Sequence, residues 1–207
     1  HVLGTPLIRQ AVMGLLMGLT AIALVYSPWG RRSGAHMNPA VTLAMARLRP
    51  GRGRDLVGYV AGQFVGGIAG MAAAAVLFGS SLSHASINWV VTTPGPRGPV
   101  PAFAAEWAMT VVMMSVVLWC SNHPRWAPRT GIASAALLAA FITLEAPLSG
   151  MSLNPARTLG PALFAGDFTG LWIYFIAPPA GMVLAAASYS RVCPDGRCPH
   201  GLQGVPQ

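Results

Sequence analysis

Residues 33–43 read SGAHMNPAVTL, and residues 149–159 read SGMSLNPARTL. Seven of the eleven positions are identical, and the identity continues past the Asn-Pro-Ala centre into the residues that follow it. Two unrelated turn signals would not share this continuation, so we interpret the two stretches as an internal repeat. The rest of the chain is arranged around this repeat.

Each copy of the repeat has the pattern of a helix start. Asn38 and Asn154 are favourable N-cap residues, and each is followed by a proline at the first helical position, where a missing N–H costs nothing. Mostly apolar residues then continue for about nine positions, or roughly 14 Å of helix. Because this is about half of the hydrocarbon thickness of a bilayer, we predict two half-helices, over residues 40–48 and 156–164.

The composition is that of a membrane protein. Hydrophobic residues make up 54% of the 207 residues and charged residues only 9%, whereas a soluble domain carries about 25% charge. Five further segments have the length and apolar character needed to span a bilayer. We therefore predict an all-α membrane protein, with one domain over residues 1–207, two re-entrant half-helices and five full spans at 7–26, 56–79, 102–120, 130–148 and 168–190. Glycines at 58, 62, 66 and 70 recur every four residues in the second span, and this spacing predicts one face for close helix packing.

The net charge of +8 comes entirely from arginine, since the chain has no lysine. The arginines lie mainly between the apolar segments, which indicates loops that orient a membrane protein and not a nucleic-acid surface. If loops 27–55 and 121–129 and the tail share one side, that side holds ten arginines and the other holds three. The positive-inside rule then predicts a cytoplasmic C-terminus, with the first residues on the opposite side.

The two half-helices are predicted to enter the membrane from opposite sides. Three spans separate them, and an odd number of spans reverses the direction of entry, as in an inverted-topology repeat. The first repeat covers 1–80, the second covers 100–192, and a tail covers 193–207. The offset between the repeats is 154 − 38 = 116 residues, which places the partner of span 102–120 before residue 1. We therefore expect six spans in a full-length protein.

These residues resemble the major intrinsic protein family, the aquaporins and glycerol facilitators. The resemblance rests on residues 33–42 and 154–162, with lesser signatures at Ala61-Gly62-Gln63 and Glu106-Trp107. It implies a bacterial-type aquaporin-like homotetramer in the inner membrane, with one pore per subunit, no cofactor, no bound metal, no nucleic-acid partner and no catalysis. It also implies that two Asn-Pro-Ala motifs line the pore, namely Asn38, Pro39, Ala40, Asn154, Pro155 and Ala156.

The same resemblance assigns a selectivity filter and two bracing residues. Arg157 follows the second motif and would be the filter arginine, with Met17, Ile142 and Met151 at the other three filter positions. Glu106 would brace the second re-entrant loop by accepting from backbone N–H groups. For His36 we expect a hydrogen bond that braces the first loop, with contact to the solute as the alternative. Glu145 lies one turn beyond Ile142 on the same helix face, and we expect it either to line the outer vestibule or to face the lipid interface.

The predicted function is a passive channel for water or small uncharged solutes that excludes ions and protons. Two half-helix N-termini, each carrying roughly half a positive charge, would meet beside an arginine. Glycerol-like solutes and metalloid acids remain alternatives, because the methionine-rich filter matches neither a typical water filter nor a typical glycerol filter. A secondary transporter would need an ion-coupling carboxylate with a partner, and an enzyme would need a cluster of bases or metal ligands in a span.

Three cysteines do not make a disulfide framework. Cys193 and Cys198 lie in the tail, close to His200. A metal site there would lack a second ligand pair. We therefore expect reduced thiols in a cytoplasmic tail.

Overall fold

The computed structural model describes residues 5–48 and 53–193. Within these residues, five helices are long and apolar enough to cross a membrane, as the sequence predicted. They are α1 (Pro6–Tyr26), α4 (Gly53–Phe78), α6 (Pro99–Ser121), α7 (Thr130–Ser149) and α9 (Leu171–Val192). The two predicted half-helices are α3 (Pro39–Leu48) and α8 (Pro155–Ala165).

Four short elements in the connecting loops were not expected. They are α2 (Pro28–Ser33), α5 (Ser80–Ser83) and the 3₁₀ turns η1 (Asn88–Val90) and η2 (Ala127–Arg129). Helix α2 has local causes: the Ser27 side chain caps its start, a proline follows, and Gly34 ends it in the left-handed conformation. This turn of helix places the first Asn-Pro-Ala stretch immediately after a sharp reversal.

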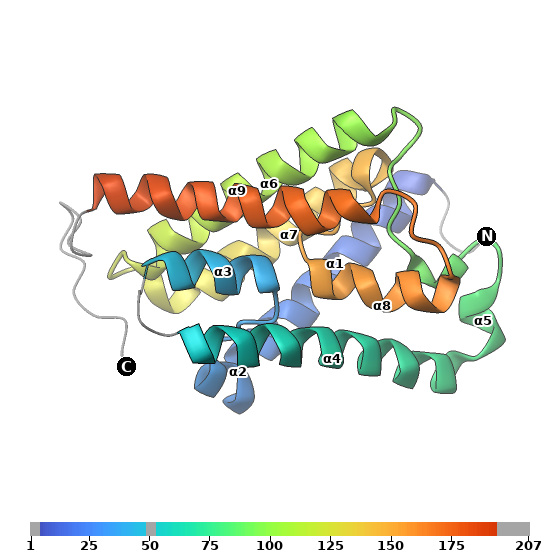
Figure 1. Cartoon of the computed structure of the whole chain (residues 1–207), viewed down its shortest axis with the longest axis horizontal. Helices are drawn as coiled ribbons and strands as arrows, with labels where there is room; N and C mark the ends of the chain where they lie inside the picture. Colours follow the sequence, from blue (N-terminus) through green and yellow to red (C-terminus); the bar gives the residue numbers. More distant parts are fainter. Residues whose placement is uncertain (1–4, 49–52, 194–207) are drawn as a thin grey trace.

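The two half-helices lie nearly in line, with their N-terminal ends facing each other, between α9 and α4 (Figure 1). Helix α3 packs against α9 from the second repeat, and α8 packs against α4 from the first. Each half-helix is thus held mainly by the long helix of the other repeat. This exchange is the arrangement expected for the predicted inverted repeat.

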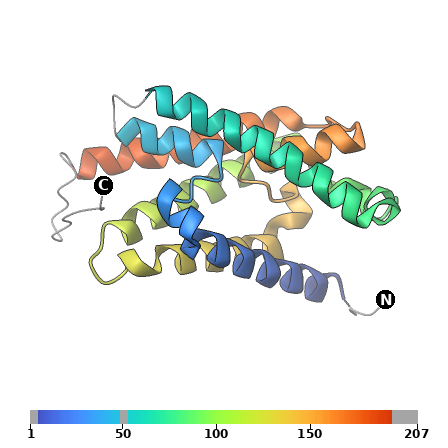
Figure 2. The same ribbon diagram turned by 90° about the horizontal axis from the view of Figure 1, so that it is seen from below.

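The remaining long helices complete the bundle. Helix α1 runs beside α7, on the opposite side of the molecule from α4 (Figure 2). Its contact with α7 depends on two buried glycines: a Cβ at Gly14 would lie 2.6 Å from the Ala139 carbonyl oxygen, and one at Gly18 would lie 3.0 Å from that of Ala135. Small residues allow helix backbones to approach closely in a membrane. Helix α6 packs against both α7 and α9.

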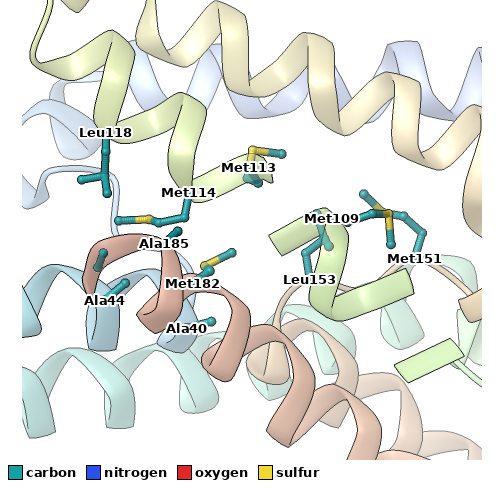
Figure 3. Close-up of a cluster of buried hydrophobic side chains, with 11 residues drawn as sticks. Ala40, Ala44, Met109, Met113, Met114, Leu118, Met151, Leu153, Met182 and Ala185 are labelled. Atoms are coloured by element: carbon teal, nitrogen blue, oxygen red, sulfur yellow. The ribbon is translucent and has the colours of Figure 1, made fainter. Parts of the chain in front are cut away.

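The largest buried cluster is rich in methionine. Met114 and Met182, from α6 and α9, fill the space beside Ala40 and Ala44 of α3 (Figure 3). Both alanines are fully buried. Because methionine is unbranched and adaptable, it fills the irregular gap between a short helix and two long ones. The cluster fixes the first half-helix against the second repeat.

The glycine stripe of α4 behaves differently from a packed helix face. A Cβ added at Gly58, Gly62, Gly66 or Gly70 would meet no described atom within 4 Å. The close contact comes instead from Gly67, where a Cβ would lie 2.6 Å from the Ala156 carbonyl oxygen at the start of α8. Among the described residues, the sequence reasoning that α4 packs through the four-residue stripe is therefore wrong by one position.

The end of α9 corrects another expectation. Cys193, which follows the helix, is disulfide-bonded and does not carry a reduced thiol. Cys198 and His200 lie outside the described residues. Within the described residues there is no group of His, Cys, Asp or Glu side chains with the arrangement of a metal site.

Candidate functional site

The two repeat stretches form two loops, which we name the first loop (Gly34–Asn38) and the second loop (Gly150–Asn154), and their first two residues have the same backbone conformation. Each begins with a glycine in the left-handed region, with φ of 69° at Gly34 and 77° at Gly150. Ala35 and Met151 follow with φ of 55° and 50°. Two consecutive left-handed residues turn the chain back toward the membrane interior, and only the first of them is relieved by being glycine.

Both asparagines cap the half-helices that follow. The Asn38 Oδ1 accepts from the Ala40 N–H at 2.9 Å. The Asn154 Oδ1 accepts from the Ala156 and Arg157 N–H groups at 3.0 and 3.3 Å. These bonds satisfy N–H groups that have no partner within the helix, and they fix the amide planes of both side chains.

The Nδ2 atoms of the same two side chains link the two loops by hydrogen bonds. Asn38 Nδ2 donates to the Leu153 carbonyl oxygen at 2.8 Å, and Asn154 Nδ2 donates to the Met37 carbonyl oxygen at 2.9 Å. Each asparagine therefore bonds the carbonyl of the residue that precedes the other asparagine. An amide nitrogen has two hydrogens, so each side chain keeps a second N–H for a further acceptor.

A cavity of about 1520 Å³ lies beside this junction. It reaches from α1 and the first loop to α4 and the start of α8. The Asn-Pro-Ala junction contributes Asn154 and Ala156 to its wall, and α1 contributes Met17 and Thr20. The glycine stripe of α4 forms another part of the wall. The lining combines a few convergent polar groups with a mostly apolar surface, as is typical of a small-molecule path.

Arg157 also lines this cavity, one residue beyond the second Asn-Pro-Ala motif. Its Nη1 donates to the hydroxyl of Thr92, which lies in the segment between η1 and α6. That segment is itself fixed, because the Gly95 N–H donates to the Leu148 carbonyl oxygen at the end of α7 at 2.9 Å. Thr92 is buried, so it holds the guanidinium in one position and leaves the other N–H groups of the fork for different acceptors.

The first loop is braced by two side chains of α4 that lie one turn apart. The Tyr59 hydroxyl donates to the Ser33 carbonyl oxygen at 3.1 Å. Gln63 Nε2 donates to the His36 carbonyl oxygen and, at 2.8 Å, to the Thr42 hydroxyl. The His36 ring packs against Tyr59, with ring centroids 5.5 Å apart. The donors that hold this loop are therefore neutral.

The second loop is held by hydrogen bonds to a carboxylate, that of Glu106 on α6. This fully buried side chain accepts from the Ser152 N–H at 2.6 Å and from the Leu153 N–H at 2.8 Å. The Ser149 hydroxyl lies 2.9 Å from the same carboxylate. Two backbone N–H groups converging on one carboxylate make charge-assisted bonds, roughly twice as strong as neutral ones.

The four predicted filter residues fall into two pairs. Met17 and Arg157 both line the cavity. Met151 is 3% exposed and belongs to the buried methionine cluster, and Ile142 packs against that cluster. Their joint action as one filter stays a prediction. Glu145 is half-buried, and its Oε2 lies 2.9 Å from the Ser149 hydroxyl.

Several supporting residues were not anticipated from the sequence. Tyr59 and Gln63 had a usable signal, since they are polar residues four positions apart in the otherwise apolar segment 56–79. Ser149 belonged to the repeat and was noted only as part of its identity. The contact of Thr92 with Arg157 could not be predicted from the sequence, because a loop sequence does not indicate which helix end the loop will pack against.

Comparisons with known proteins agree with this architecture. Residues 8–189 match the sequence profile of the major intrinsic proteins. The chain is 37% identical over 176 residues to aquaporin NIP1-3 of Oryza sativa subsp. japonica, a match that covers 84% of this chain and 59% of the relative. The chain thus spans less than two thirds of the length of that relative. It is also 38% identical over 178 residues to glycerol uptake facilitator protein-like 6 of Lactiplantibacillus plantarum, covering 84% of this chain and 81% of the relative.

A solved structure shows the same fold. The aquaglyceroporin from Plasmodium falciparum superposes with a TM-score of 0.70 at 18% sequence identity, and the match covers 92% of this chain and 98% of that one. At this identity the likeness concerns the fold alone. The profile match over residues 8–189 shows that the chain belongs to the major intrinsic protein family.

Proposed function

We propose that the protein is a passive membrane channel for water and small uncharged solutes. The observation that carries this proposal is the reciprocal exchange between the two loops, in which each asparagine amide donates to a carbonyl of the other loop and keeps one N–H for a solute. Fixed donors at the meeting point of two half-helices suit a polar molecule that gives up part of its hydration shell. They offer no group for covalent chemistry.

Exclusion of cations follows from the charges around the same point. The aligned half-helices place two N-termini there, each equivalent to roughly half a positive charge. Arg157, held by Thr92, adds a full positive charge at the cavity wall. A cation or a hydrated proton that approaches the two N-termini and Arg157 is repelled by their positive charge, whereas a neutral solute meets donors that it can use.

The solute range that fits best includes molecules larger than water. Met17 lines the cavity together with Phe78 and Met71, which are apolar and, in the case of the methionines, adaptable. The name of the Lactiplantibacillus relative refers to glycerol. We therefore propose glycerol-like solutes as a second class of substrate for the same path, beside water.

Stopped-flow light scattering on proteoliposomes of the full chain tests these proposals. Water, glycerol and boric acid gradients are applied in turn, with protein-free vesicles as the reference. We expect faster water and glycerol exchange than in the reference vesicles, linear in the gradient, with no increase in proton leak. Saturable uptake coupled to an ion gradient would identify a secondary transporter instead, and rates equal to those of the reference vesicles would reject the channel.

Assembly and membrane orientation are part of the same proposal. We propose a homotetramer in a bacterial inner membrane with the C-terminus in the cytoplasm, supported by the family membership and by the arginine distribution. Large apolar side chains of the long helices are exposed on this single chain, such as Val65 at 66% and Leu144 at 76%, which is consistent with contact with lipid or with other subunits. Crosslinking in native membranes measures the stoichiometry, and a C-terminal protease-accessible tag measures the orientation.

A further inference from the structure

At the junction between α7 and the second loop, the carboxyl groups of Glu106 and Glu145 both lie within hydrogen-bond distance of the Ser149 hydroxyl. Ser149 Oγ lies 2.9 Å from Glu106 Oε1 and 2.9 Å from Glu145 Oε2. The same oxygen accepts from the Met151 N–H at 3.1 Å. Ser149 is fully buried, and these three groups are the hydrogen-bond partners of its hydroxyl among the described residues.

The number of hydrogens available to the Ser149 hydroxyl determines whether the two carboxyl groups around it can both be ionised. A serine hydroxyl has one hydrogen to donate and two lone pairs to accept with. Met151 takes one lone pair, and the single hydrogen serves only one carboxyl group. The other carboxyl must therefore donate to the second lone pair, which requires that it carry a proton. With two ionised carboxylates, one of the two 2.9 Å contacts would join oxygen lone pairs with no hydrogen between them.

The environment identifies Glu145 as the protonated partner. Both carboxyl oxygens of Glu106 accept hydrogen bonds from backbone N–H groups, those of Ser152 and Leu153. These interactions favour its ionised form. Glu145 Oε1 is instead buried with no hydrogen-bond partner among the described residues. The order of donation is therefore Glu145 O–H to Ser149 Oγ, and Ser149 O–H to Glu106.

The elements packed against the end of α7 are α6, α9, α1 and the segment between η1 and α6. In that segment Arg97 is exposed, and Thr92 holds Arg157. Glu106 faces it from α6, and Tyr174 lies near it on α9, where its hydroxyl donates to the Ser149 carbonyl oxygen at 2.6 Å. Helix α1 packs along α7 and has one charged residue, Arg9, which is exposed. Ionisation of Glu145 would thus add a second negative charge beside Glu106 without a described cation on the helices packed against it.

We propose that Glu145 is a positioning residue of the second loop that acts in its protonated form through Ser149, so that its ionisation lowers permeation. Loss of the proton removes the donor to Ser149 Oγ. It also places two negative carboxylates, Glu106 and Glu145, next to the same hydroxyl. The hydroxyl or the carboxylate must then move. Either movement disturbs the bonds that fix the Met151 N–H and Glu106, and with them the backbone of residues 151–153 beside the cavity.

The expected behaviour is a permeability that is high at acidic pH and falls as the pH rises. The sign follows from the bonding: the protonated form makes the contact, so the stabilisation is present at low pH and lost when the proton leaves. This effect on permeation rests on the proposed channel function. The protonation itself does not.

Two measurements separate these points. Water permeability of proteoliposomes is recorded from about pH 5 to about pH 9, a range that covers displaced carboxyl groups, for wild type, Glu145→Gln, Ser149→Ala and the control Leu144→Ala, whose side chain is exposed. The glutamine amide supplies the same donor without titrating. We expect a several-fold fall with pH in wild type and Leu144→Ala and a flat profile in Glu145→Gln and Ser149→Ala. A flat wild-type profile, or an equal fall in Glu145→Gln, overturns the proposal.

Infrared spectroscopy of wild type tests the protonation directly, whether or not the protein conducts. The chain has only five carboxyl side chains, so a protonated carboxyl band is resolvable. We expect this band at neutral pH, its loss at alkaline pH, and its absence from Glu145→Gln. A band that persists in Glu145→Gln overturns the assignment, as does its absence from wild type at neutral pH. If the band behaves as expected while vesicles show no permeability, the proposed channel function fails and the assignment stands.

Discussion

The first and second loops share a sequence pattern and the backbone conformation of their first two residues, yet different chemical groups hold them. Gln63 and Tyr59 hold the first loop through neutral donors to backbone carbonyls. Glu106 holds the second loop by accepting from two backbone N–H groups inside the protein. A repeated sequence therefore predicts equivalent loops but not equivalent support, because the supporting residues come from helices outside the repeat stretch.

One element of support does recur in both loops. Tyr59 donates to the Ser33 carbonyl oxygen at 3.1 Å, and Tyr174 donates to the Ser149 carbonyl oxygen at 2.6 Å. The serines are 149 − 33 = 116 residues apart and the tyrosines 174 − 59 = 115. Ser33 is exposed, however, while Ser149 is fully buried. The shared bond thus lies at the surface in one repeat and in the interior in the other.

Replacement of Glu106 by glutamine should have the largest effect. The substitution removes the charge and turns one acceptor into an NH₂ group that faces a backbone N–H. Hydrogen bonds to charged groups contribute about 1.5–3 kcal/mol, and unsatisfied buried donors cost a similar amount. We expect a large loss of thermal stability in detergent and water permeability close to that of protein-free vesicles. Wild-type permeability in this variant would show that the carboxylate does not fix the second loop.

A methyl group at the contact between α4 and α8 should have the next largest effect. Gly67→Ala would place its Cβ 2.6 Å from the Ala156 carbonyl oxygen, and overpacking of this kind costs about 1–3 kcal/mol. Gly66→Ala is the matched control, since its Cβ would meet no described atom within 4 Å. Unfolding midpoints of the two variants, compared under the same conditions, should separate them. Equal midpoints would contradict the described packing of α4.

Replacement of Gln63 by leucine tests the first loop. The variant loses the donors to the His36 carbonyl oxygen and the Thr42 hydroxyl. Neutral hydrogen bonds contribute about 1 kcal/mol each, so we expect a smaller loss of stability than in Glu106→Gln and only a partial loss of water permeability. The two variants are measured side by side, and a larger effect for Gln63→Leu would reverse the order of support that we assign to the loops.

The smallest effect is expected outside the membrane-spanning segments, at Asp167. The Thr169 N–H donates to its Oδ1 at 2.9 Å and lowers the pKa of this carboxyl below its ordinary value. A lowered pKa means that the ionised form contributes stability at neutral pH, which is lost as the pH falls through the carboxyl range. Asp167→Asn should lower the unfolding midpoint by about one degree at neutral pH. The difference should vanish in acid, and a difference that grows in acid would refute this explanation.

The sequence predicted the fold well because the deciding signals are local. Apolar length identified the five spans, and the Asn-Pro pair marked where α3 and α8 begin. The supporting contacts were harder to predict, since they join residues far apart in the chain. Thr92 and Arg157 are 65 positions apart, and Glu106 and Leu153 are 47. Only the packing of α6 and of the segment before it reveals such partners.

Two local predictions failed for identifiable reasons. The four-residue glycine spacing in α4 indicated one packing face, but the residue that α8 approaches is Gly67, one position further round the helix. The number and spacing of cysteines favoured a reduced tail, whereas Cys193 is disulfide-bonded. In both cases the outcome depends on which residue lies close in space, and the spacing along the sequence does not determine this.

The most direct test of the account concerns the point where the loops meet. Osmotic water permeability is measured in proteoliposomes at matched protein density for wild type, for the Asn38→Leu/Asn154→Leu double variant, and for Leu144→Ala, whose side chain is 76% exposed. Leucine is close to asparagine in size and removes both the cap and the bond to the opposite loop. The account predicts wild-type permeability for Leu144→Ala and the protein-free rate for the double variant. Retention of wild-type permeability by a folded double variant would contradict a path that passes between the two asparagines.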